Sequence, residues 1–246
     1  MKITSFLVAL QFLTRIPVTL RLQPTEKQTA YSLLYYPLVG LLIGLILYSL
    51  NIVLSETDDM LRAILILLTW VIVTGALHLD GLADSADALV GGFGNKDKTL
   101  AIMKDPYCGP VGVVSLVLIL LLKFSIIISI IEEIAFLLVL APCLARTSVI
   151  WSFLSIPYVR ENGLGTILDM HYPKSPAIIL LVTIACFILL SLGWLGLIIL
   201  LFIFCFMYLL KRILLVRIEG MTGDTLGAQI EILEVSILLL GLLVSM

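Results

Sequence analysis

The sequence has few charged residues and few residues that bind metals through sulfur or nitrogen. Asp, Glu, Lys and Arg make up 13% of its 246 residues, about half of their share in a soluble domain. The net charge of −2 is too small to indicate a nucleic acid or an acidic protein as a partner. The four Cys residues are widely separated, form no C-x-x-C pair and have no His at metal-ligand spacing. These absences exclude the common zinc patterns.

Several motifs of well-known enzyme classes are also absent. The sequence contains no P-loop, no G-x-G-x-x-G, no H-E-x-x-H and no G-x-S-x-G. It therefore gives no support to nucleotide hydrolysis at a Walker site, dinucleotide binding, zinc proteolysis or serine hydrolysis.

Long apolar runs, in contrast, dominate the chain. Hydrophobic residues make up 61% of it, and the mean hydropathy is +1.18. A run of about twenty apolar residues is long enough to cross a bilayer as a helix. We therefore expect an all-α, polytopic helical membrane protein with about seven transmembrane helices, in which residues 1–246 form a single integral membrane domain. The predicted spans are approximately residues 31–54, 61–79, 110–131, 134–156, 177–192, 194–215 and a last span that ends near residue 246.

The N-terminal apolar segment, residues 3–13, is too short to cross the membrane. It is expected to lie at the interface or to re-enter the membrane. It has no small-residue cleavage site, so a removed signal peptide is not expected.

The distribution of Lys and Arg predicts the orientation. Arg62 alone lies on one side of the predicted spans, Lys123 and Arg146 lie within spans, and the other twelve of the fifteen cations lie on the opposite side. Because cytoplasmic loops carry the excess of Lys and Arg, the N-terminus and the long polar loops are predicted to face the cytoplasm. The twelve are Lys2, Arg15, Arg21, Lys27, Lys96, Lys98, Lys104, Arg160, Lys174, Lys211, Arg212 and Arg217.

One stretch, residues 78–92, carries three carboxylates at the end of an apolar run. Asp80, Asp84 and Asp87 are spaced i, i+4 and i+7, so on a helix they fall at about 0°, 40° and −20° and share one face. Three like charges on one face repel one another, so a cation is expected to neutralise them. Carboxylate oxygens at this spacing suit Mg²⁺ or Mn²⁺. The alternative, a solvated helix end, is disfavoured because the other faces of this helix are apolar. His78 points about 160° away from Asp80 on a continuous helix, which leaves a structural role and a catalytic role open.

A second acidic pair follows at the start of the last span. Asp224 and Glu231 are again i and i+7, and the small residues Gly223, Gly227 and Ala228 between them allow a helix or a ligand to approach closely. The alternative is a helix contact with a buried polar pair. Two acidic faces on one side of the membrane favour a site with two metals, or with one metal and a base, for phosphoryl transfer.

Phosphate chemistry also needs cations, and four are candidates. Lys104, Arg160 and Arg15 lie in predicted polar segments, whereas Arg146 lies inside an apolar span and must have an acidic or phosphate partner there. For Arg146 a salt bridge to one of the carboxylates is the alternative. The residues by themselves thus indicate a membrane-embedded, cytoplasm-facing, metal-dependent phosphotransferase.

The motifs resemble the adenosylcobinamide-GDP ribazoletransferase family, also called cobalamin synthase. The strings H-L-D-G-L-A-D-x-x-D at 78–87 and T-G-D-x-L-G-A at 222–228 are the most specific. The other matching stretches, in chain order, are residues 12–17, 36–44, 102–105 with Gly109, Arg146, 160–165, and Glu231 with Glu234. Ala88, Pro106 and Glu219 depart from the family pattern, which has Gly, Ser and Gly at these positions.

The resemblance implies the reaction and the roles. An α-ribazole, or its 5′-phosphate, attacks the cobinamide-linked phosphorus of adenosylcobinamide-GDP and releases GMP, with Mg²⁺ as cofactor. We expect Asp80, Asp84, Asp87 and Asp224 to bind the metal, and Asp84, Asp224, Glu231 and His78 to be the catalytic candidates. Arg15, Lys104, Arg146 and Arg160 are expected to bind phosphate. The expected partners are these two small molecules and membrane lipid, with a homo-oligomer left open.

Two other functions are less favoured. A CDP-alcohol phosphotransferase also uses Asp-rich helices and Mg²⁺, but its D-G-x-x-A-R string is absent because Asp84 follows Ala83 here. An ion-coupled secondary transporter would show an inverted repeat and carboxylates near the middle of the membrane. We find no repeat, and the carboxylates lie at span ends.

Overall fold

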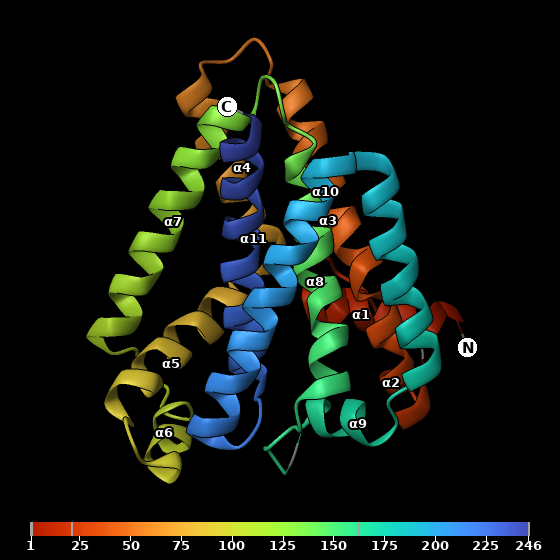
Figure 1. The fold of residues 1–246 in the computed structure, drawn as a ribbon, viewed down its shortest axis with the longest axis vertical. Helices are drawn as coiled ribbons and strands as arrows, with labels where there is room; N and C mark the ends of the chain where they lie inside the picture. The colour runs from red at the N-terminus through yellow and green to blue at the C-terminus, as the bar shows by residue number, and fades with distance from the viewer. Residues whose placement is uncertain (1, 21, 162, 246) are drawn as a thin grey trace.

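The computed structural model describes residues 2–20, 22–161 and 163–245 and is helical nearly throughout. Arg21, which contributes to the charge asymmetry, and Asn162 of the 160–165 motif lie outside the described residues, as do Met1 and Met246. Figure 1 shows the helices in chain order. They are α1 (Lys2–Leu13), α2 (Glu26–Ser32), the 3-10 helix η1 (Leu33–Tyr35), α3 (Tyr36–Val53), α4 (Asp59–Thr74), α5 (Leu77–Gly91), α6 (Lys96–Ile102), α7 (Pro110–Ile130), α8 (Leu137–Ser155), α9 (Leu164–Met170), α10 (Lys174–Ile218) and α11 (Gly223–Ser245).

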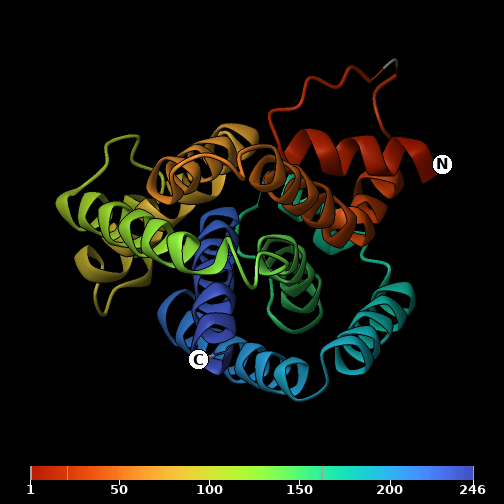
Figure 2. The same cartoon turned by 90° about the horizontal axis from the view of Figure 1, so that it is seen from above.

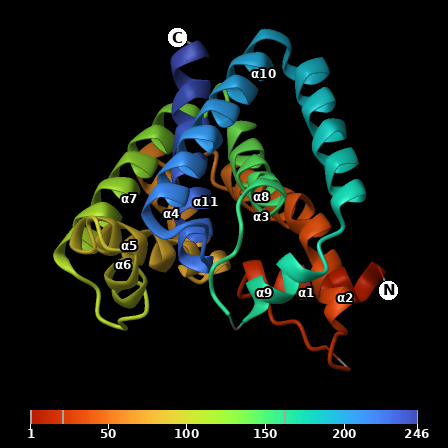
Figure 3. The same ribbon diagram turned by 60° about the horizontal axis from the view of Figure 1, so that its bottom comes forward.

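Helices α8 and α11 form the centre of the bundle. Most of each helix is buried, whereas α7 and α10 bury only a small part of their length. Figure 2 shows α8 surrounded by α3, α10 and α11. The short helices α5, α6 and α9 lie at the end of the bundle opposite to the C-terminus (Figures 1 and 3). The predicted polar segments therefore gather at one end of the molecule.

The structure confirms a polytopic helical membrane protein. Within the described ranges, five helices are long and apolar enough to cross a membrane, or six if α4 and α5 count as one bent span. Helix α10 is counted once here, although Gly193 (φ 53°, ψ −120°) divides it into two arms. The chain turns back at the top of Figure 1, and the second arm descends away from the first. A total of seven is reached only if both arms of α10 and the bent α4–α5 pair are all counted as spans, so the predicted number of about seven stays a prediction.

The predicted second span, residues 61–79, is wrong at its end. Helix α4 stops at Thr74, and α5 begins at Leu77 after a bend of 85°. Gly75 (φ 63°) and Ala76 (φ 57°) both adopt the left-handed conformation, which ends a helix because its backbone cannot continue the hydrogen-bond ladder. The carboxylate motif thus lies on a separate helix. That helix ends at Gly91 with Gly92 as its C-cap, as the run of glycines at residues 91–94 predicts.

Helices α3 and α8 approach each other closely at two glycines of the 36–44 motif. A Cβ atom on Gly40 would lie 2.3 Å from the Pro142 carbonyl oxygen, and one on Gly44 would lie 2.5 Å from the Val139 Cα. Small residues allow such backbone contact between membrane helices. This contact fixes α8, and with it the centre of the bundle, against α3.

We predict that Gly40→Ala destabilises the protein by about 1–3 kcal/mol, because the added methyl group must separate α3 from α8. The thermal unfolding midpoint in detergent measures the effect. Leu45→Ala on the same helix is the control, since Leu45 is 48% exposed. An unchanged midpoint for Gly40→Ala would contradict the close contact.

Candidate active site

Helix α5 presents two carboxylates that have no partner. Asp80 is exposed and Asp84 is half-buried, and among the described residues neither side chain accepts a hydrogen bond or forms an ion pair. Asp84 interacts electrostatically with Asp80, Asp224 and Asp87, and with the opposite charge of Arg160. The predicted shared face is present, and it carries an excess of negative charge that a bound cation would neutralise.

The third carboxylate of the motif, Asp87, caps a neighbouring helix. Its Oδ2 accepts a hydrogen bond from the Gly109 amide at 2.7 Å, and its Oδ1 accepts one from the Gly112 amide at 2.9 Å. These amides belong to the first turn of α7, where a negative charge is favourable. Asp87 therefore joins α5 to α7, and its predicted role as a metal ligand stays a prediction.

Helix α11 crosses α5 at a contact between two glycines. A Cβ atom on Gly81 would lie 2.7 Å from the Asp224 carbonyl oxygen, and one on Gly227 would lie 3.2 Å from the His78 carbonyl oxygen. The sequence predicted that Gly227 would allow a close approach. The crossing brings Asp224, in the first turn of α11, beside the Asp80 and Asp84 face, as their mutual electrostatic interactions show. The two predicted acidic segments thus meet in one site.

Arg160 is the cation of this site. Its guanidinium forms an ion pair with the Asp224 carboxylate, and its Nη2 donates to the Met103 carbonyl oxygen at 3.4 Å. The second contact brings the loop that begins at Lys104 toward Asp224. Lys104 itself is exposed. Of the four predicted phosphate-binding cations, Arg160 thus borders the carboxylates, and the role of Lys104 toward phosphate stays a prediction.

Arg15 lies at the bend between α4 and α5. Its amide donates to the Val73 carbonyl oxygen at 2.7 Å, and a Cβ atom on Gly75 would lie 2.3 Å from the Arg15 Cγ. Arg15 is exposed. It therefore contacts the bend that positions α5, and its role toward phosphate stays a prediction.

Tyr158 is a site residue that the sequence reasoning missed. Its segment pairs with Met221 as an isolated parallel bridge, and its side chain lines a cavity together with Asp80 and Asp224. Burial raises the pKa of the Tyr158 phenol, although Arg160 lowers it in part. The phenol is therefore protonated at neutral pH and can donate a hydrogen bond. Its position two residues before Arg160 was the one signal in the sequence.

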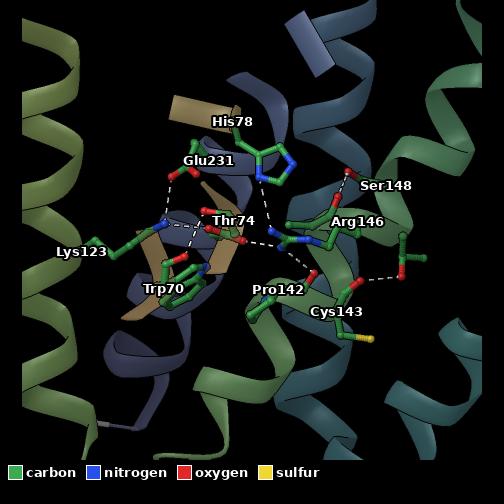
Figure 4. Close-up of polar contacts among 12 residues, drawn as sticks. Trp70, Thr74, His78, Lys123, Pro142, Cys143, Arg146, Ser148 and Glu231 are labelled. Carbon is green, nitrogen blue, oxygen red and sulfur yellow. Dashed lines mark hydrogen bonds and ion pairs between the residues drawn. The ribbon is translucent and has the colours of Figure 1, made fainter. Parts of the chain in front are cut away.

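Four charged side chains form a network inside the bundle (Figure 4). Lys123 on α7 contacts Glu231 at 2.9 Å and Glu234 at 2.7 Å, and Arg146 on α8 forms an ion pair with Glu234. All four side chains are at most 3% exposed. The Lys123 ammonium also lies 4.3 Å from the centre of the Trp70 ring. Two positive and two negative charges balance, which is the condition for burying them.

The network includes or contacts three residues that the sequence analysis selected, Arg146, Glu231 and His78. For Arg146 the structure shows the alternative, a salt bridge to a carboxylate of the last span. Glu231 lies two turns along α11 from Asp224, about 10 Å at 1.5 Å per residue, and is paired with Lys123. His78 is buried, and its Nδ1 lies 3.4 Å from Arg146 Nη2. The proposed roles of Arg146 in phosphate binding and of Glu231 and His78 in catalysis stay predictions.

The whole chain matches one protein family. A sequence model of cobalamin-5-phosphate synthase matches residues 5–243. The chain belongs to the cobalamin-5-phosphate synthase family. A relative from Pseudomonas syringae is 47% identical over 237 residues, which cover 95% of this chain and 97% of the relative. A relative from Acinetobacter baumannii is 48% identical over 235 residues, which cover 94% of each chain. Both are named adenosylcobinamide-GDP ribazoletransferase, and no solved structure matches the chain.

These matches confirm the predicted family and the assignment to an enzyme of cobalamin synthesis. One departure from the pattern given in the sequence analysis lies at a left-handed position, a conformation that favours Gly. Glu219 stands where the pattern has Gly, and it adopts a left-handed conformation (φ 62°) at the end of α10. Its carboxylate contacts the Lys96 ammonium at 2.5 Å.

We predict that Lys123→Met lowers stability by about 3–5 kcal/mol, because it leaves one buried negative charge without compensation. The double variant Lys123→Met with Glu231→Gln restores charge balance and should recover much of this loss. Thermal unfolding of both variants in detergent, each compared with Glu231→Gln alone, measures the coupling. A double variant no more stable than Lys123→Met would show that the charges do not act together.

Proposed function

We propose that this protein is a magnesium-dependent phosphotransferase that joins adenosylcobinamide-GDP to α-ribazole or its 5′-phosphate. A ribazole hydroxyl attacks the phosphorus attached to cobinamide, and the bond from this phosphorus to the GMP oxygen breaks. The products are GMP and adenosylcobalamin or its 5′-phosphate. The observation that carries the proposal is the unpartnered carboxylate pair Asp80 and Asp84 beside Asp224 and Arg160, in a chain of this family.

The donor set fits Mg²⁺. Asp80 and Asp84 offer oxygen ligands one turn apart, and neither has a hydrogen bond or ion pair to another described residue that would have to break first. Across residues 2–20, 22–161 and 163–245, no three His, Cys, Asp or Glu side chains are placed to hold a metal ion by themselves. Mg²⁺ usually binds through one or two carboxylates together with substrate phosphates and water, so two carboxylates suffice. Bound there, the ion would offset the charge of the pyrophosphate and of the leaving GMP.

Arg160 and Lys104 are proposed to bind the pyrophosphate. A guanidinium recognises two phosphate oxygens at once, and Arg160 is held beside the carboxylates by Asp224 and the Met103 carbonyl group. When Arg160 turns to phosphate, the Asp224 carboxylate loses its partner. It is then free to accept the proton of the attacking ribazole hydroxyl, as a general base does.

The reaction is proposed to occur at the cytoplasmic side of the plasma or inner membrane. The excess of Lys and Arg supports this orientation, because the structure gathers the polar segments at the same end as α5 and α6. Basic residues such as Lys98 and Arg212, both exposed there, suit the anionic lipids of a cytoplasmic leaflet.

We predict that Asp84→Asn lowers GMP release by about 100-fold or more, because the neutral amide weakens the cation site at the pyrophosphate. GMP is measured after incubating purified protein with adenosylcobinamide-GDP, α-ribazole and Mg²⁺. Asp97→Asn on the exposed first turn of α6 is the matched control and should keep its activity. A folded Asp84→Asn protein with near-normal turnover would refute this site.

We also predict that EDTA stops GMP release and that excess Mg²⁺ restores it. Because Asp80 is proposed as a ligand, Asp80→Asn should need about tenfold more Mg²⁺ for half-maximal rate. A titration of rate against Mg²⁺ concentration measures the shift. Equal Mg²⁺ requirements for Asp80→Asn and the unaltered protein would exclude Asp80 as a ligand.

A further inference from the structure

A cavity of about 160 Å³ opens beside the carboxylates. It lies where α1, α3, α5, α8, α9 and α11 meet, together with the segment around Tyr158. Most of its lining is apolar, including Val149, Leu168 and Ile230. Asp80 and Asp224 line the same cavity, so the apolar space is continuous with the phosphotransfer site.

Aromatic side chains enter this cavity in two stacked pairs. Phe12 and Tyr36 have ring centres 6.3 Å apart with an interplanar angle of 27°. Phe153 and Tyr158 have ring centres 6.2 Å apart with an angle of 15°. Tyr172 stacks on Phe153 in turn, at 6.0 Å, and fixes the second pair. Stacked rings offer a planar aromatic ligand both apolar area and favourable ring contacts.

Two buried polar atoms of the lining residues have no partner. The Tyr36 hydroxyl and the His78 Nε2 make no hydrogen bond to any described residue, although Tyr36 is 2% exposed and His78 is 3% exposed. A buried polar group without a partner costs about 1–3 kcal/mol. Both side chains line the cavity, so a ligand there lies close to two polar groups that lack a hydrogen bond.

The neighbouring Arg146 determines which ring nitrogen of His78 carries the proton. An Arg side chain can only donate hydrogen bonds, so the His78 Nδ1 that faces Arg146 Nη2 must accept. The proton of the neutral ring is then on Nε2. His78 therefore offers its ligand an N–H donor, and this ring cannot act as a base through Nε2.

The volume excludes one of the two proposed substrates. A cavity of about 150 Å³ in another protein binds benzene, so this cavity admits an aromatic ring system and not a corrinoid. Ribazole is a nucleoside whose base is a planar fused heterocycle, and one ring nitrogen of that base carries an in-plane lone pair. Such a base matches the apolar lining, the stacked aromatic pairs and the unpartnered donors.

We propose that this cavity binds the aromatic base of the acceptor nucleoside. This proposal rests on the proposed function. The His78 Nε2–H and the Tyr36 hydroxyl supply hydrogen bonds, one to the ring nitrogen and one to an oxygen of the sugar. The base is thereby held with its sugar toward Asp80 and Asp224, where the hydroxyl is activated. In this arrangement His78 binds and positions the acceptor.

The first test fills the cavity. Val149→Phe on α8 places a ring in the space for the base and should raise the KM for α-ribazole by about tenfold or more. The KM for adenosylcobinamide-GDP should stay within about twofold, since that substrate binds outside the cavity. The matched control is Val139→Phe on the same helix, because Val139 lines a separate apolar cavity of about 680 Å³. Both KM values of the control should be unchanged.

The second test removes one donor without changing the shape. Tyr36→Phe deletes a hydroxyl that has no partner in the described part of the chain, so the unfolding midpoint should stay the same or rise. If this hydroxyl binds the acceptor, the KM for α-ribazole rises by about three- to tenfold. A lower midpoint with an unchanged KM would indicate a structural role and would overturn the assignment. This test also decides the matter if Val149→Phe does not fold.

The outcomes separate the two proposals. If the protein releases GMP but Val149→Phe and Tyr36→Phe leave the KM for α-ribazole unchanged, the cavity assignment fails and the proposed function stands. If the unaltered protein releases no GMP, the proposed function fails. Equilibrium dialysis with α-ribazole alone then tests the cavity directly. Binding that Val149→Phe abolishes would support the cavity assignment, and absence of binding would overturn it.

Discussion

Two glutamates of α11 are held between a lysine of α7 and an arginine of α8, and this buried charge network determines how the three helices fit together. Apolar membrane helices have little preference for one rotation over another, since lipid is as apolar as their partners. Buried charged side chains fix the rotation of each helix, because each charge must lie next to its counter-charge. Arg146 also contacts His78, so the network positions α5 as well. The geometry of the site thus depends on an interaction deeper in the bundle, two turns along α11 from Asp224.

The bend at Gly75 and Ala76 positions the carboxylates of α5 for a candidate active site. A straight helix would have carried the carboxylates away from the membrane, each to a different depth. The 85° bend lays α5 across the end of the bundle, so that Asp80 and Asp84 meet the first turn of α11. The glycine contact at Gly81 and Gly227 then brings the two backbones together. The site is therefore built where helices begin, bend and cross.

The sequence predicted the membrane helices apart from the end of the second span, and it predicted the shared face of the carboxylates, because hydropathy and helical periodicity are local properties. It did not predict the bend, since a left-handed Ala76 has no sequence signal. The partners of Asp87 were also hidden, because the amides of Gly109 and Gly112 belong to a helix that follows a long loop. The sequence correctly predicted that Arg146 has an acidic or phosphate partner, but only the packing of α8 on α11 shows that this partner is Glu234. Tyr158 was missed because a tyrosine beside a polar loop has many ordinary roles.

The contact between Gly81 and Gly227 has a consequence for how this cavity can change during evolution. Both glycines line the cavity, so that wall consists of main chain, and any added side-chain atom would separate α5 from α11. The wall next to the reacting groups is thus closed to mutation. The opposite wall, with Val149, Leu168 and Phe153, consists of side chains that can be exchanged for larger or smaller ones. Relatives that accept different ligands would be expected to diverge on this second wall and to keep the first.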